Sequence, residues 1–182
     1  MVKLRHFTYA EFDSPDKPGS AKDEMQDQFM LMIDEARERA GIPFVVNSGF
    51  RTRAHHAKIY AELNQKPRWG SLHLNGRAAD IGLPEFAREQ ARVKIIEAGV
   101  EAGFNGFGIY DSFIHLDNRS KLAIWKGNGI SQSSFDVFED YITKGVAGRT
   151  IHEAIEEEKQ SKRGLAFVSS LVALAIIGIS IK

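Results

Sequence analysis

The chain has 182 residues, of which 43% are hydrophobic and 26% charged, so it can bury the core of one ordinary domain but has no room for a second full catalytic domain. Its 24 basic and 24 acidic residues cancel, which leaves no overall positive field for a phosphate backbone and argues against a nucleic-acid partner. The sequence contains no cysteine, which excludes disulfides, thiolate zinc fingers and thiol nucleophiles, so any metal must be bound by His, Asp or Glu.

Hydrophobic spacing predicts that helices alternate with short strands. Apolar residues recur at helical spacing from Met25 to Ala36, until Gly41 and Pro43 stop the pattern, and short apolar runs that end in turn residues indicate strands. In chain order we expect a helix from Met25 to Gly41, a strand over 44–46, a turn over 48–51, a helix over 53–63, a loop over 64–70, a strand over 78–83 and a helix from Pro84 to Gly103.

The next part of the chain is richer in short apolar runs. Residues 107–110 and 113–116 are separated by a polar Asp-Ser pair, which fits either two paired strands or one bulged strand. A further strand is expected over 122–125, and a short helix over 135–144. Helices and short strands mixed within one domain predict an α+β fold, with a small, mostly antiparallel sheet packed against helices.

The C-terminal residues differ from the rest of the chain. Residues 150–163 predict a polar helical stalk, and the stretch from Gly164 to Ile181 carries no charge. A helix of that length spans about 27 Å, near the lower limit for the hydrocarbon core of a bilayer, and no polar stripe runs along it. We therefore expect a transmembrane anchor over 164–182, rather than a helix packed on its own domain, and a globular domain over 1–149.

Charges beside this apolar stretch predict its orientation. Lys159, Lys162 and Arg163 precede the stretch and Lys182 follows it, which favours a globular domain on the cytoplasmic side of the membrane. No apolar run of the length that a secretory signal needs is visible near the N-terminus. The domain is therefore expected to begin in the cytoplasm, tethered through its C-terminal helix.

Two of the six histidines have a chemically useful partner. His73 precedes Asp80 by seven residues, and a glycine between them lets the backbone turn, so both side chains can converge on one ion. His115 lies in a predicted strand, where alternation places it on one face with Asp111 and Asp117. Two histidines and one aspartate with an open fourth position are what a catalytic zinc site needs.

These residues belong to ordered blocks that resemble the zinc D-Ala-D-Ala carboxypeptidases and related murein endopeptidases, which include bacteriophage endolysins. The resemblance covers the chain from about Phe44 to Arg119. The three blocks are Ser48-Gly49-Phe50-Arg51-Thr52, then Ser71-x-His73 through Gly76-x-Ala78-x-Asp80, then Gly108-Ile109-Tyr110 followed by Phe113-Ile114-His115-Leu116-Asp117.

The resemblance implies a fold like that of the hedgehog and D-Ala-D-Ala peptidase domains, and zinc ligands at His73, Asp80 and His115. It implies that Arg51 binds a substrate carboxylate, a carbonyl oxygen or the oxyanion of the tetrahedral intermediate, a task that suits a permanently charged planar fork. Ser48 is implied to have a supporting or substrate-contacting role beside Arg51.

The identity of the general base stays open. Related enzymes often have an acidic residue three positions before the last histidine ligand, where this chain has Ser112. Asp117 could act as the base or could orient a ligand, and Asp111 is the second candidate. Trp69 and Tyr110 flank the blocks, where packing against a peptide stem competes with burial in the core.

The resulting hypothesis is a zinc peptidase that hydrolyses an amide bond in the stem peptides or cross-links of peptidoglycan. The tail suggests a phage lytic enzyme tethered to the host inner membrane or to a virion membrane. Two alternatives belong to other classes: a metal-stabilised binding module without hydrolysis, and a structural virion membrane protein.

Overall fold

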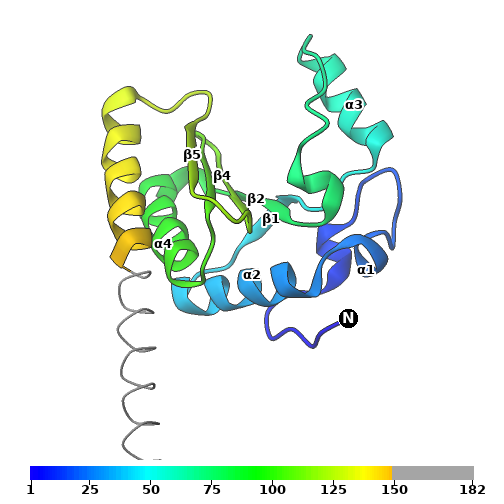
Figure 1. Ribbon diagram of the computed structural model, residues 1–182, viewed down its shortest axis with the longest axis horizontal. Coiled ribbons are helices and arrows are strands. Elements are labelled where there is room, and N and C mark those ends of the chain that lie inside the picture. Colours follow the sequence, from blue (N-terminus) through cyan, green and yellow to red (C-terminus); the bar gives the residue numbers. More distant parts are fainter. Residues whose placement is uncertain (149–182) are drawn as a thin grey trace, which may run out of the picture. The chain divides into compact units, whose positions relative to one another are not determined.

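The computed structural model describes residues 1–148, and a five-stranded sheet lies at their centre (Figure 1). Its spatial order is β1-β2-β4-β3-β5, and all neighbouring strands are antiparallel except β3 and β5, which run parallel. The predicted α+β class is confirmed, although the sheet is mixed. The strands are β1 (Val45–Ser48), β2 (Ala78–Gly82), β3 (Gly106–Ile109), β4 (Phe113–Asp117) and β5 (Ala123–Lys126).

Helices surround this sheet unevenly. Two 14-residue helices, α2 (Asp27–Ala40) and α4 (Arg88–Glu101), pack against each other, whereas α3 (Arg53–Glu62) stands apart from α4 on the other side of the molecule (Figure 1). Residues 132–148 are also helical. The shorter pieces are α1 (Ala21–Glu24) and the 3₁₀ helices η1 (Tyr9–Phe12), η2 (Leu72–Asn75) and η3 (Glu85–Ala87).

Aromatic and branched side chains from all these layers fill one core. The apolar face of α2 and the central strands β2, β3 and β4 provide most of it, because strands covered on both faces bury successive residues. The fully buried members include Phe12, Phe29, Phe104, Phe107, Ile33, Ile81, Ile96, Ile109 and Ile114.

Most elements form where hydrophobic spacing predicts them, with shifted ends. The runs over 107–110 and 113–116 form two paired strands, with Ile109 opposite Ile114. The helix predicted from Pro84 opens with a 3₁₀ turn over Glu85–Ala87, for which Pro84 is the N-cap, and continues as α4 from Arg88. The last described helix is longer than expected, since it covers 132–148.

The C-terminal predictions fall outside the part of the chain that the structure describes. This applies to the polar stalk over 150–163 and to the transmembrane anchor over 164–182. Within residues 1–148, no helix combines the length and the apolar character needed to cross a membrane. Met1–Val146 form one compact unit.

Asp34 of α2 fastens the N-terminal segment to the domain and should make stability depend on pH. Its buried carboxylate accepts hydrogen bonds from the backbone N–H groups of Arg5 and His6 at 3.0 and 2.8 Å. Burial acts to raise the pKa of Asp34, but these hydrogen bonds outweigh burial and hold the pKa below its ordinary value. Its stabilising effect is therefore present above the unfolded pKa, about 3.9, and is lost as the pH falls through the lower folded value.

We expect Asp34→Asn to lower the free energy of unfolding by about 1.5–3 kcal/mol near pH 7, the usual range for hydrogen bonds to a charged group. The deficit should shrink as the pH falls below about 4, because the Asp34 carboxyl of the unfolded wild-type chain then takes up a proton while that of the folded chain is still charged. Urea unfolding across this pH range measures both effects. Exposed Asp23→Asn is the control, and an Asp34→Asn deficit that is equal at all pH values would contradict the account.

Candidate metal centre

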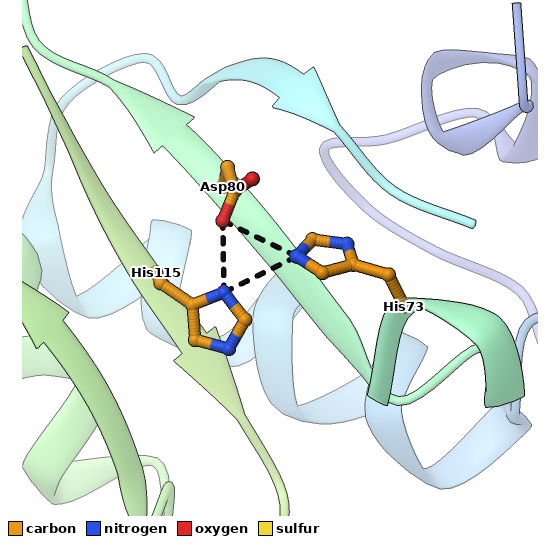
Figure 2. Close-up of side chains that lie close together, drawn as sticks. All are labelled: His73, Asp80 and His115. Atoms are coloured by element: carbon orange, nitrogen blue, oxygen red, sulfur yellow. Dashed lines mark hydrogen bonds and ion pairs between the residues drawn. The ribbon is translucent and has the colours of Figure 1, made fainter. Parts of the chain in front are cut away.

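Three potential ligands from separate elements meet at one point. His73 comes from η2, Asp80 from β2 and His115 from β4, and Figure 2 shows the three side chains directed toward one another. His73 Nε2 lies 3.3 Å from Asp80 Oδ1 and 3.2 Å from His115 Nδ1, and the last two atoms are 2.8 Å apart. Ligands placed tetrahedrally at about 2.0–2.1 Å from a zinc ion lie about 3.3 Å from one another. The observed triangle therefore fits three corners of such a site.

Hydrogen bonds on the far side of each imidazole determine which nitrogen faces the triangle. The Nδ1–H of His73 donates to the carbonyl oxygen of Gly49 at 2.7 Å, which leaves the Nε2 lone pair free. The Nε2–H of His115 donates to Asp117 Oδ2 at 3.0 Å, which leaves the Nδ1 lone pair free. When both rings are in these neutral tautomers, two lone pairs and a carboxylate oxygen converge on one point. This arrangement is unfavourable alone and is satisfied by a cation.

Burial and neighbouring charges oppose each other at every member of this triangle. Burial acts to raise the pKa of Asp80, but the two neighbouring imidazoles outweigh burial and hold the pKa well below its usual range. Burial lowers the pKa of His73 against the opposing effect of Asp80. Burial also acts to lower the pKa of His115, but hydrogen bonds to Asp117 and Asp80 outweigh it and raise the pKa. Asp80 is therefore ionised at neutral pH and supplies an anionic ligand.

Strand register brings two of the ligands together. β2 and β4 pair antiparallel with Asp80 directly opposite His115, so their side chains leave the same face of the sheet. The third ligand depends on a loop, since the short helix η2 carries His73 and ends at Gly76. The backbone carbonyl of His73 also accepts from the N–H of Arg51 at 3.1 Å, which joins η2 to the end of β1.

Gly76 is required where η2 turns into β2. Its φ of +62° is a left-handed conformation, and a Cβ at this position would lie 1.9 Å from the backbone oxygen of Glu24. Gly41 has the same φ of +62°, but a Cβ at position 41 would meet no atom within 4 Å, so Gly41 provides a matched comparison.

We expect Gly41→Ala to cost only the left-handed strain of about 1–2 kcal/mol. Gly76→Ala should cost at least about 2 kcal/mol more, since the clash with Glu24 adds to the strain, and it should weaken zinc binding because His73 is displaced. Chemical unfolding and zinc titration of both variants check this. Equal losses of stability in the two variants would show that the contact with Glu24 is unimportant.

Asp117 lies behind His115, away from the triangle. It is fully buried, and its two oxygens accept from His115 Nε2 at 3.0 Å and from the guanidinium of Arg119 at 2.7 and 2.5 Å. Burial acts to raise the pKa of Asp117, but His115 and Arg119 outweigh burial and lower it far below its ordinary value. Asp117 is therefore charged at neutral pH and is the acceptor that holds the His115 ring. Asp111 instead lies in the turn between β3 and β4 and pairs with Arg88 at 2.8 Å.

Arg51 and Ser48 lie on the other side of Asp80. Arg51 donates from Nε to Ser48 Oγ at 2.7 Å and from Nη2 to Asp80 Oδ2 at 2.5 Å, while Asp80 Oδ1 faces the histidines. The side chain of Arg51 is 13% exposed. The structure therefore places both residues beside the triangle, with Ser48 orienting the guanidinium.

Two residues that surround His115 were missed by the reasoning from sequence. Arg119 pairs with Asp117. Because His115, Asp117 and Arg119 are spaced two residues apart, strand alternation could have indicated Arg119 as a neighbour of this site. Trp125 of β5 packs against the His115 ring with centroids 5.0 Å apart and lies 5.1 Å beneath the guanidinium of Arg119. No local pattern signals this, because the contact depends on the parallel pairing of β5 with β3.

The aromatic residues beside the motifs have different positions. Tyr110 stacks on Phe113 with ring centroids 4.1 Å apart, and its hydroxyl accepts from the indole N–H of Trp125 at 3.2 Å. Trp69 is not in the core, since 46% of it is exposed. His56 is buried beside it, with centroids 5.7 Å apart.

A buried His-Asp-His set, with each imidazole fixed by an outer hydrogen bond, is a group that could hold a metal ion and would leave one coordination position open. Residues 5–117 match the family model described as Peptidase M15, so the chain belongs to the peptidase M15 family, the zinc D-Ala-D-Ala carboxypeptidase-like family, and the resemblance found in its motifs is confirmed. The family consists of zinc-dependent metallopeptidases. No curated protein matches the chain.

Proposed function

We propose that this chain is a zinc peptidase that hydrolyses an amide bond in the stem peptides or cross-links of peptidoglycan, with His73, Asp80 and His115 as the zinc ligands. The observation that carries the proposal is the convergence of two imidazole lone pairs and one carboxylate oxygen at tetrahedral spacing in an M15 chain. Three protein ligands leave a fourth position for water or substrate, as in catalytic rather than structural zinc sites.

When bound, zinc supplies Lewis-acid polarisation of a carbonyl group and lowers the pKa of a water molecule. The chain's own contribution is to orient the substrate and stabilise charge. We propose that Arg51 binds a substrate carboxylate or the developing oxyanion, because Nε and Nη2 are occupied while Nη1 makes no hydrogen bond to the described residues. Ser48 would hold the guanidinium in place for this task.

Of the two roles open to Asp117, we propose that of orienting His115. A general base must exchange a proton with the reacting water, whereas both oxygens of Asp117 are engaged by His115 and Arg119 and the residue is fully buried. Its charge would instead maintain the neutral His115 tautomer whose Nδ1 faces the ion. Asp111 remains the second candidate for the base, and its ion pair with Arg88 would have to open.

The experiment is to incubate the full chain with purified peptidoglycan in zinc, in chelator, and in chelator followed by excess zinc. We expect release of free amino groups only in the presence of zinc, and the masses of the fragments would identify the bond and separate carboxypeptidase from endopeptidase action. No release by a chain that carries one zinc ion would refute the peptidase proposal.

One observation favours a second candidate, a metal-stabilised binding module. Both carboxylates considered as general base are already paired with arginine in the described structure. That candidate predicts zinc-dependent binding to peptidoglycan without release of amino groups, so the same experiment separates the two. A structural virion membrane protein would depend on the apolar tail alone and predicts neither binding nor release.

We further propose that the enzyme is a phage lytic protein tethered to the host inner membrane or a virion membrane, with its domain first in the cytoplasm. The uncharged stretch from Gly164 to Ile181 and the basic residues before it support this. Removal of residues after Arg163 should release an active domain from membranes. If the truncated chain instead becomes insoluble, the apolar tail is needed by the domain itself and the tether is excluded.

A further inference from the structure

Basic residues are concentrated in the segment of the chain between Arg51 and His73. This segment, residues 53–70, consists of α3 and the loop after it, and we name it the α3 arm (Figure 1). Although the whole chain is neutral, Glu62 is the arm's one acidic residue. Its exposed basic residues are Arg53, Lys58, Lys66 and Arg68. The arm is therefore positively charged although the net charge of the whole chain is zero.

The basic side chains of the arm have little internal compensation. Lys58 lies 4.0 Å from Glu62, and both are well exposed, so this pair is weak. Arg53, Lys66 and Arg68 form no ion pair with any residue of the described part of the chain. Elsewhere in the same domain, exposed arginines such as Arg5 and Arg39 do pair with carboxylates. The arm thus leaves cations available for an external anion.

Contacts between side chains within the arm order its surface. Inside it, the buried His56 donates from Nε2 to the backbone oxygen of Arg68 at 3.1 Å, and its ring lies between Tyr60 and Trp69. Trp69 is 46% exposed, and the guanidinium of Arg53 lies over its ring at 4.4 Å. This cation–π contact fixes the plane of the guanidinium while its N–H groups stay free to donate.

Both ends of the arm are attached to the metal centre. Arg51, two residues before Arg53, donates to the proposed ligand Asp80. Trp69 precedes the proposed ligand His73 by four residues, which separates them by no more than about 14 Å even in a fully extended chain. A peptide whose scissile bond lies at the triangle would therefore pass close to the base of the arm, where Arg53 lies over Trp69.

We propose that the α3 arm binds the carboxylate groups of an acidic peptide strand, namely the stem peptides of peptidoglycan on either side of the bond that is cut. This inference rests on the proposed function. Planar guanidinium groups such as Arg53 and Arg68 suit carboxylates because they donate two parallel hydrogen bonds. Positive charge also steers an anionic polymer toward the site at low ionic strength. The arm would thus select substrates by charge, apart from the chemistry at the triangle.

The test measures binding without hydrolysis. The full chain is sedimented with insoluble peptidoglycan in the presence of chelator, at low and high salt. A charge-reversed arm combines Arg53→Glu, Lys58→Glu, Lys66→Glu and Arg68→Glu. We expect at least about a tenfold loss of affinity at low salt, and a wild-type affinity that falls as salt rises.

A matched variant controls for net charge. Lys3→Glu, Lys22→Glu, Lys94→Glu and Lys121→Glu change the same number of exposed basic residues outside the arm, and this variant should bind within about twofold of wild type. Circular dichroism and zinc titration would verify that both variants fold. Equal loss of binding in the two variants, or no loss in the arm variant, would overturn the proposal.

Chemical change of the substrate identifies the occupant. Peptidoglycan whose carboxylates have been converted to amides should bind the wild-type chain about as weakly as native peptidoglycan binds the arm variant. Undiminished binding of the wild-type chain to the amidated material overturns the proposal. Binding to vesicles of anionic phospholipid is measured in parallel, and an arm variant that loses binding only to these vesicles also overturns the proposal. If the arm variant fails to bind while the wild type also releases no amino groups in zinc, the arm stands and the peptidase proposal fails.

Discussion

Replacement of His73 by alanine is expected to abolish zinc binding and hydrolysis while the domain stays folded. His73 Nε2 is one corner of the triangle, and its ring is almost fully buried. Loss of a direct ligand should weaken zinc affinity by more than the roughly 10–100-fold that follows loss of an outer hydrogen-bond partner.

The variant also leaves the carbonyl oxygen of Gly49 without its donor, which should cost about 1–3 kcal/mol of stability. Zinc titration, amino-group release and circular dichroism together separate loss of the site from loss of the fold. His55→Ala is the matched control, because that ring makes no hydrogen bond in the described part of the chain and zinc affinity should be unchanged. Wild-type zinc affinity in His73→Ala would exclude His73 as a ligand.

Replacement of Arg119 by glutamine should weaken zinc binding by about 10–100-fold, although Arg119 touches no ligand directly. Its guanidinium holds Asp117 through hydrogen bonds at 2.7 and 2.5 Å, and Asp117 in turn accepts from His115 Nε2. Without the arginine, a fully buried carboxylate loses its countercharge, so the position of the His115 ring is no longer determined.

Competition with a chelator of known affinity measures this loss. Arg119→Lys keeps the charge but not the two-pronged donor and should fall between wild type and Arg119→Gln. Arg77→Gln is the matched control, since that guanidinium also bonds at the end of β4, to Asn118 at 2.8 and 2.7 Å, but contacts neither Asp117 nor His115. An equal loss of zinc affinity in Arg77→Gln would indicate a general disturbance of the strand rather than a role of Arg119 through Asp117.

Local patterns predict the parts of the site that depend on local geometry. Strand alternation predicts that His115 and Asp117 share a face, and their 3.0 Å contact agrees. A glycine between His73 and Asp80 predicts a turn, and Gly76 adopts a positive φ. The same alternation extended to Asp111 is wrong, because the strand begins at Phe113 and Asp111 lies in the preceding turn.

Other parts of the site depend on contacts between residues far apart in the chain. The pairing of Asp80 with His115 is set by strand register over thirty-five residues, which periodicity does not specify. The hydrogen bond from His73 to Gly49 requires the end of β1 to meet η2. Gly49 can lie this close to Phe12 because it has no side chain, since a Cβ on residue 49 would be 2.6 Å from the backbone of Phe12. The sequence predicts a strand over 122–125 but not the strand with which it pairs. Its parallel pairing with β3 brings Trp125 onto His115.

The most direct test of the account is X-ray absorption at the zinc edge of the full chain loaded with one equivalent of zinc. We predict four-coordinate zinc with two imidazole nitrogens at about 2.0–2.1 Å and oxygen ligands at about 2.0–2.2 Å, and this two-imidazole spectrum should be absent from His73→Ala, which no longer binds zinc. A spectrum with oxygen ligands and no imidazole would contradict the central claim, because zinc would then bind elsewhere than at His73, Asp80 and His115.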